Sequence, residues 1–155
     1  MADDVPLTAR VVTPDEVAPI APFGLQMRVM LRSADTGGQF SAIHCIHRPG
    51  EGPPPHLHRD QQEYFLVLSG TYRVQVGDAA PREVGPGTLI FVPNGTVHSF
   101  SNVGTSDAAM LDWSLPGGQD RYFEEIDALQ AGAGFDLARV AEVNLRHATE
   151  FPGGH

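Results

Sequence analysis

The chain has 155 residues, 41% of them hydrophobic and 19% charged, a composition typical of one globular domain. Its 10 Lys and Arg against 19 Asp and Glu give a net charge of -9, which disfavours nucleic acid and anionic membranes as partners. The single cysteine excludes an internal disulfide, no apolar run is long enough to span a membrane, and the first residues lack the features of a secretory signal. We therefore expect a cytoplasmic protein that acts on a small molecule.

The first segment, residues 1–22, is rich in proline, with prolines at positions 6, 14, 19 and 22. Proline lacks a backbone N–H and interrupts helices, so we expect an extended N-terminal arm. The arm lies either along its own domain or along a partner subunit.

Residues 23–115 alternate short β-rich runs with turns that contain glycine and proline. The pattern predicts strands over Gln26–Arg32, Phe40–His47, Glu63–Leu68, Tyr72–Val76, Thr88–Val92, Val97–Asn102 and Ala108–Leu115. Many short strands at this spacing are typical of an all-β sandwich or barrel.

The pattern changes over residues 116–155, where apolar side chains recur at helical spacing. We expect a first helix over Gln119–Ala131. Asp136 is suited to cap a second helix, whose Leu137 and Val140 lie on one side. This segment is interpreted as a helical extension of the same domain, covering an end or an edge of the strands.

Two histidines separated by one residue, His56 and His58, give the strongest functional signal. Successive side chains of a strand point to opposite faces, so these two point the same way and can reach one ion. Glu63 opens an apolar run in which an unpartnered carboxylate is costly to bury. His98 follows a sharp turn and can approach from another strand. We predict that the four residues hold one divalent transition metal, for which iron, nickel, cobalt, manganese, copper and zinc all suit the donors.

Each of the four residues also has an interpretation without a metal. His56 and His58 would then be surface histidines, and His98 a hydrogen-bonded core residue. Glu63 would form an ion pair with Arg59 or Arg82.

The spacing of these residues resembles the two motifs of the cupin superfamily. Gly50, His56, His58, Glu63 and Gly70 match the first motif in order and spacing. The second motif is matched by Gly87, Pro93, Gly95, His98 and Asn102. The resemblance implies a double-stranded β-helix, the cupin jelly-roll barrel, over residues 23–115.

A broader likeness links His98–Gly104, Tyr122–Glu125 and His147–Gly153 to the small bacterial cupins that resemble quercetin 2,3-dioxygenase. In that group the residues matching His56, His58, Glu63 and His98 bind the metal. The resemblance implies that Glu63 is also the catalytic base that takes a proton from the substrate hydroxyl.

Four aromatic residues are candidates for the substrate pocket. By the two-residue period of a strand, Phe65 shares a face with Glu63, and Phe100 shares a face with His98. Phe91 and Trp113 lie in neighbouring apolar runs and are assigned to the same pocket or to the core.

Three polar residues and the cysteine have open roles. His44 and His47 stand three apart, so at most one of them faces the interior of the barrel. Asp112 interrupts an apolar run and is either an edge residue facing water or a group of the pocket. Cys45 is interpreted as a small buried side chain.

The resemblance to the cupins implies three candidate functions. The first is a metal-dependent dioxygenase of quercetinase-like type acting on a small organic substrate. The second is an isomerase, cyclase, decarboxylase or lyase that uses the ion only as a Lewis acid. The third is a cupin that binds a small ligand without turnover. We expect a homodimer, because an open jelly roll leaves strand edges for a second copy.

Overall fold

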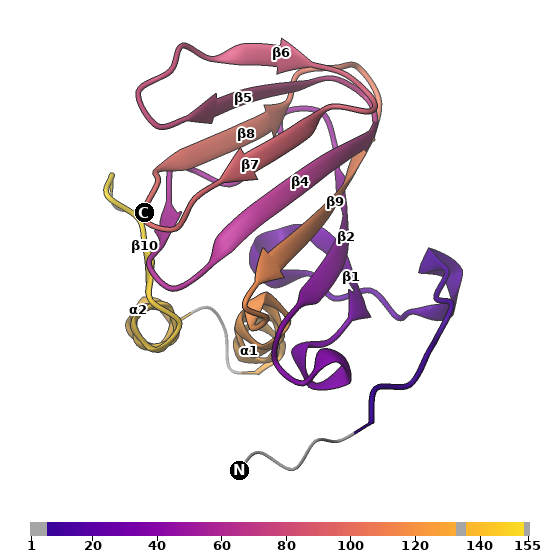
Figure 1. The fold of residues 1–155 in the computed structure, drawn as a ribbon. Coiled ribbons are helices and arrows are strands. Elements are labelled where there is room, and N and C mark those ends of the chain that lie inside the picture. The colour runs from indigo at the N-terminus through magenta and orange to yellow at the C-terminus, as the bar shows by residue number, and fades with distance from the viewer. Residues whose placement is uncertain (1–5, 133–135, 154–155) are drawn as a thin grey trace.

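The computed structural model describes residues 6–132 and 136–153, and their main feature is two β-sheets packed face to face (Figure 1). The first sheet has the order β1-β2-β9-β4-β7. Its strands are β1 (Gln26–Leu31), β2 (Ser41–His47), β9 (Ala108–Leu115), β4 (Gln62–Ser69) and β7 (Leu89–Val92). All the pairings in this sheet are antiparallel.

The second sheet is made of shorter pieces. β6 (Arg82–Val84), β5 (Tyr72–Val76) and β8 (His98–Asn102) pair in that order, and β10 (Thr149–Glu150) pairs with β3 (Leu57–His58). The two pieces are joined by an antiparallel bridge between His56 and His98, whose backbone N–H groups donate to each other's carbonyls at 3.1 and 2.9 Å. The order is therefore β6-β5-β8-β3-β10, and the predicted all-β jelly roll is confirmed.

The core lies between the two sheets. Inward-facing side chains alternate with outward-facing ones along each strand, as the two-residue period requires. Tyr72, Ile43 and Met110 are among the large side chains that are completely buried there. Phe65 and Val67 of β4 pack in the same cluster and continue the face that begins with Glu63.

The two helices lie at one end of the strands (Figure 1). α1 (Gln119–Ala131) and α2 (Leu137–Arg146) pack on each other through Tyr122, Ile126, Val140 and Val143. Asp136 caps α2 by accepting a hydrogen bond from the N–H of Ala138 at 3.0 Å, as predicted. Among the described residues, neither helix has the length and apolar character that crossing a membrane would need.

The N-terminal arm ends against its own chain. Ile20 and Met27 exchange backbone hydrogen bonds of 2.8 and 2.9 Å. The N–H of Ala21 donates to Asp127 of α1 at 2.8 Å. Only short 3-10 turns interrupt the described part of the arm, at Pro14–Glu16 and Pro22–Gly24. Residues 1–5 lie outside the described part of the chain.

The predicted strands are all present, and their ends differ from the prediction by no more than one residue. The first helix has the predicted bounds. Three short strands were not predicted, namely β3, β6 and β10. Each has only two or three residues, too few to show the alternation by which a strand is recognised.

Candidate metal centre

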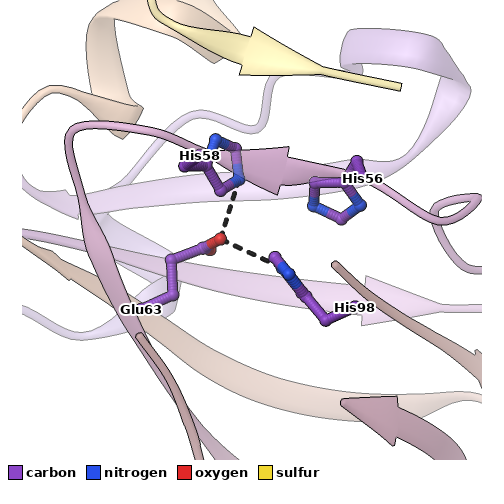
Figure 2. A group of neighbouring side chains, drawn as sticks. All are labelled: His56, His58, Glu63 and His98. Atoms are coloured by element: carbon purple, nitrogen blue, oxygen red, sulfur yellow. Dashed lines mark ion pairs between the residues drawn. The ribbon is translucent and has the colours of Figure 1, made fainter. Parts of the chain in front are cut away.

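Four side chains meet inside the barrel: His56, His58 and Glu63, which are close in the sequence, and His98, which is 35 residues further on (Figure 2). All four are buried, and their possible ligand atoms lie within 4.8 Å of one another. Glu63 projects from β4 of the first sheet, while the three histidines belong to the second sheet. Both sheets therefore contribute side chains to the site.

The local structure explains why these side chains converge. His56 and His58 flank Leu57, so both point to the same side of β3. The backbone bridge between His56 and His98 brings their imidazole rings to a centroid distance of 4.2 Å. The rings of His56 and His58 are 5.1 Å apart, and those of His58 and His98 are 5.8 Å apart.

The Nδ1 atoms of the imidazoles form hydrogen bonds on the side of the ring away from the other donors. His56 Nδ1 lies 2.8 Å from the carbonyl of Pro54, and His98 Nδ1 lies 3.0 Å from the carbonyl of Thr96. A carbonyl oxygen only accepts hydrogen bonds, so both Nδ1 atoms carry the proton. In the neutral rings both Nε2 atoms then keep lone pairs, which is the form in which imidazole binds a metal.

Glu63 supplies the fourth donor. Its Oε1 lies 2.7 Å from Nε2 of His58 and 3.2 Å from Nε2 of His98 (Figure 2). At these ion-pair distances, Glu63 Oε1 and His98 Nε2 still lack a hydrogen-bond partner of suitable geometry among the described residues. Buried acceptor atoms left facing one another are unfavourable without a cation between them. The donors present therefore fit a bound metal ion.

Burial and the neighbouring charged groups together determine which of these side chains are protonated. Burial, together with His98 and His58, lowers the pKa of His56 to about 3, so this imidazole is neutral at neutral pH. Burial raises the pKa of Glu63, but His58 and His98 lower it more, and the net pKa lies well below its ordinary value. A neutral imidazole and an ionised carboxylate are the states that bind a metal.

The donor types limit the ion. Three imidazoles and one carboxylate suit divalent iron, manganese, nickel, cobalt, copper or zinc, and they carry one negative charge in total. Four buried residues of this chain could thus hold one divalent metal with a net charge of about +1 at the site.

A cavity of about 270 Å³ opens beside this group and is lined by three of its members, His56, His58 and Glu63. It is lined mostly by apolar side chains from both sheets, both helices and the C-terminal segment. Of the predicted pocket residues, Phe65 and Phe100 line it. Other apolar residues of its wall are Phe23, Leu25, Met27, Tyr122, Phe123, Leu137, Val140 and Phe151. Such a cavity suits a small, largely apolar ligand that reaches the four donors.

Phe91 and Trp113 do not line this cavity. They lie on the outer face of the first sheet, where Tyr64 separates them, with ring-centroid distances of 5.0 Å to Phe91 and 5.6 Å to Trp113. Phe91 is 48% exposed. Tyr64 is directly opposite Phe91 in one neighbouring strand and Trp113 in the other, so all three share the face turned away from Glu63 and Phe65.

His47 and Asp112 are polar residues of the cavity whose roles the sequence left open. His47 faces inward and its Nδ1 lies 2.9 Å from the hydroxyl of Tyr72, while His44 lies on the other face of β2. Burial lowers the pKa of His47 to about 4, so this ring is uncharged at neutral pH. The three-residue spacing correctly indicated that no more than one of these histidines faces the interior.

Asp112 lies on β9 directly opposite Phe65 and is 5% exposed. Burial and the neighbouring charge of Glu63 raise its pKa well above the ordinary value. Glu63 is therefore the ionised member of this pair and Asp112 the neutral one. The signal for Asp112 in the sequence was its position as one acidic residue in an apolar run.

The structure also shows the surroundings of Cys45, Arg59 and Gly52. Cys45 is buried, and burial raises the pKa of its thiol, which keeps it protonated. Arg59 does not pair with Glu63; its guanidinium binds Glu150 at 3.0 and 2.7 Å. Gly52 was not recognised from the sequence, although a Cβ there would meet the carbonyl oxygen of Phe100 at 1.9 Å.

The fold and these motifs correspond to a known family. Residues 44–114 match the family model described as "Cupin domain". These residues form a cupin domain, and the described part of the chain has the cupin fold.

Individual relatives cover only parts of the sequence. The chain is 35% identical over 82 residues to "Mannose-1-phosphate guanylyltransferase 2" of Escherichia coli O157:H7, which covers 53% of this chain and 17% of that protein. It is 40% identical over 58 residues to "Probable oxidoreductase patJ" of Aspergillus clavatus, which covers 37% of this chain and 18% of that protein. The chain thus spans less than a fifth of the length of these two relatives.

Among solved structures, KdgF from Halomonas sp. is similar to this chain with a TM-score of 0.63 and 19% sequence identity. The match covers 72% of this chain and 99% of that one. At this identity the likeness concerns the fold, and it extends beyond the residues matched by the family model.

Metal binding should stabilise the protein. An ion present at 100 times its Kd adds about 2.7 kcal/mol, which raises Tm by roughly 5–11 °C in a chain of this size. We expect this shift when Zn²⁺, Mn²⁺ or Fe²⁺ is added to metal-free protein in a thermal-melting assay. His98→Ala should abolish it, and His44→Ala, on the outer face, should retain it. An unchanged shift in His98→Ala would contradict the site.

Proposed function

We propose that this protein is a metal-dependent enzyme whose substrate binds through an oxygen atom beside His56, His58, Glu63 and His98. The observation that carries the proposal is that three of the four donors, His56, His58 and Glu63, line a largely apolar cavity of about 270 Å³, with His98 directly behind them. A purely structural ion has its ligands closed around it, whereas four protein donors on an ion that prefers six leave room for a substrate.

The proposed reaction is a dioxygenase reaction of quercetinase-like type, in which a carbon–carbon bond is cleaved and both atoms of dioxygen enter the products. When bound, the divalent ion supplies a Lewis acid that stabilises a substrate oxyanion, and a redox-active ion also supports reaction with dioxygen. The resemblance of the motifs and tail to quercetinase-like cupins supports this reaction. The relative named "Probable oxidoreductase patJ" also supports an oxidoreductase reaction.

The residues of the chain divide the remaining work. Glu63 is ionised and acts as the base that takes the proton of the substrate hydroxyl. Phe65 and Phe100 contact the apolar body of the substrate and exclude water from the reacting group. Asp112, being neutral, does not add a second negative charge next to the oxyanion.

Turnover should require dioxygen. With flavonols and other enols as substrates, an oxygen electrode should record oxygen uptake in proportion to substrate loss, in protein purified without a nickel column and analysed for its metals. Equal rates with and without oxygen would refute the dioxygenase and favour a Lewis-acid isomerase, cyclase, decarboxylase or lyase. Tight binding without turnover would favour a ligand-binding cupin.

Glu63→Gln should reduce activity more than metal content. Glutamine keeps the shape and one oxygen donor but cannot take up the substrate proton, so kcat should fall by roughly 10²-fold or more. Steady-state kinetics and elemental analysis of the same preparation measure the two losses. His98→Ala is the matched comparison, because it should lose metal and activity together. An equal loss of both in Glu63→Gln would make Glu63 a ligand only.

Leu137→Trp should narrow the entrance of the cavity. Leu137 lines the cavity but is 61% exposed, so a larger side chain there obstructs the substrate without straining the core. We expect KM to rise about tenfold, the equivalent of about 1.4 kcal/mol, with little change in Tm. Leu145→Trp is the control, since Leu145 is 82% exposed on the same helix and lies away from the cavity. Equal effects of the two variants would contradict this access route.

A further inference from the structure

We propose that Thr149, in the C-terminal strand β10, is a positioning residue that orients His58 for metal binding. Its hydroxyl oxygen lies 2.9 Å from Nδ1 of His58. The two side chains are 5% and 4% exposed, so water does not compete for this contact. The inference rests on the metal centre of the proposed function and is independent of the reaction carried out there.

The direction of the hydrogen bond follows from a second contact. The Thr149 hydroxyl also lies 3.3 Å from the carbonyl of His147, to which it donates its proton. A hydroxyl has one proton and two lone pairs, so its oxygen is then free to accept the Nδ1–H of His58. His58 Nε2 is left with a lone pair directed toward the other three donors (Figure 2).

His58 differs from the other two imidazoles, because its Nδ1 atom finds its partner outside its own strand. His56 and His98 both use the carbonyl two residues earlier, at Pro54 and Thr96. The corresponding carbonyl for His58 is that of His56, and it already accepts the backbone N–H of His98 at 2.9 Å. Thr149 supplies the missing acceptor from 91 residues away.

The backbone places Thr149 for this role. β10 pairs with β3 in a register that sets Thr149 opposite His58, and the N–H of Arg59 donates to the carbonyl of Ala148 at 2.9 Å. The ring of Phe151 stacks on that of His56 with a centroid distance of 5.6 Å and an interplanar angle of 27°. Thr149 therefore contacts the ring of His58 and Phe151 that of His56, so this segment holds two of the four proposed metal ligands.

The test compares two substitutions of Thr149 in the full-length protein. Thr149→Val keeps the shape and removes the acceptor, whereas Thr149→Ser keeps the acceptor and removes a methyl group. Loss of such an outer hydrogen bond typically weakens metal binding 10–100-fold. We expect roughly this increase in the Kd for Zn²⁺ in Thr149→Val, measured by competition with a chromophoric chelator, and a change of less than about threefold in Thr149→Ser.

Glu150→Gln is the control for the docking of β10. It removes the surface ion pair between Arg59 and Glu150 but leaves Thr149 in place, so zinc affinity should not change. Equal weakening in Thr149→Val and Thr149→Ser, or wild-type affinity in both, would overturn the proposal. Failure of the wild-type protein to bind Zn²⁺, Mn²⁺ or Fe²⁺ would instead remove the metal centre itself.

Nitrogen-15 NMR of the zinc-loaded wild-type protein gives a second readout that needs no variant to fold. The His58 ring should carry its proton on Nδ1, with slow exchange against water, and the metal on Nε2. Zinc on Nδ1 of His58, or rapid exchange of the Nδ1 proton, would overturn the assignment. In Thr149→Val the same proton should exchange faster, while that of His98, bonded to the Thr96 carbonyl, should be unchanged.

Discussion

The backbone pairing of His56 with His98 is the contact on which the rest of the site depends. Its two hydrogen bonds join β3 and β10 to the sheet of β5, β6 and β8, and they set two imidazoles side by side. The loop before His56 lies so close to β8 that Gly52 has no space for a side chain against Phe100. The same contact thus completes the second sheet and assembles half of the metal-binding group.

Electrostatics then limits what this enclosed site can contain. Burying a carboxylate is costly unless a cation or hydrogen bonds compensate it, and here the ion pairs with His58 and His98 hold the pKa of Glu63 well below its ordinary value. A second charged carboxylate would add repulsion at the same depth, and Asp112 avoids this by remaining protonated. With the imidazoles neutral, the four donors would give a metal ion one negative charge, fewer than the several carboxylates of a calcium site.

The strands and the four converging residues could be predicted because the two-residue period and the motif spacings are local in the sequence. The positions of Phe91 and Trp113 on the outer face of the first sheet could not be predicted from the sequence. In β7 all four residues are apolar, so the sequence does not show which face is buried. In β9 the usual pattern is reversed: Asp112 and Ser114 are buried, and Trp113 is directed outward. Polar side chains of β9 face the interior because the interior contains the candidate site. Hydrophobic alternation alone does not reveal this.

The contribution of the C-terminal segment was also hidden, because β10 has two residues and its partner strand is 91 residues away. β10 pairs with the edge of β3, Thr149 contacts the ring of His58, and Phe151, the residue after β10, stacks on that of His56. The ion pair of Arg59 with Glu150 is exposed and contributes little to holding it there. Its attachment therefore depends on the backbone pairing, on the burial of Thr149 and on the stacking of Phe151 against His56. Because detachment of β10 would remove the Nδ1 hydrogen bond of His58, a metal ion held by this ring would stabilise the docked C-terminal segment, and the docked segment would favour the ion.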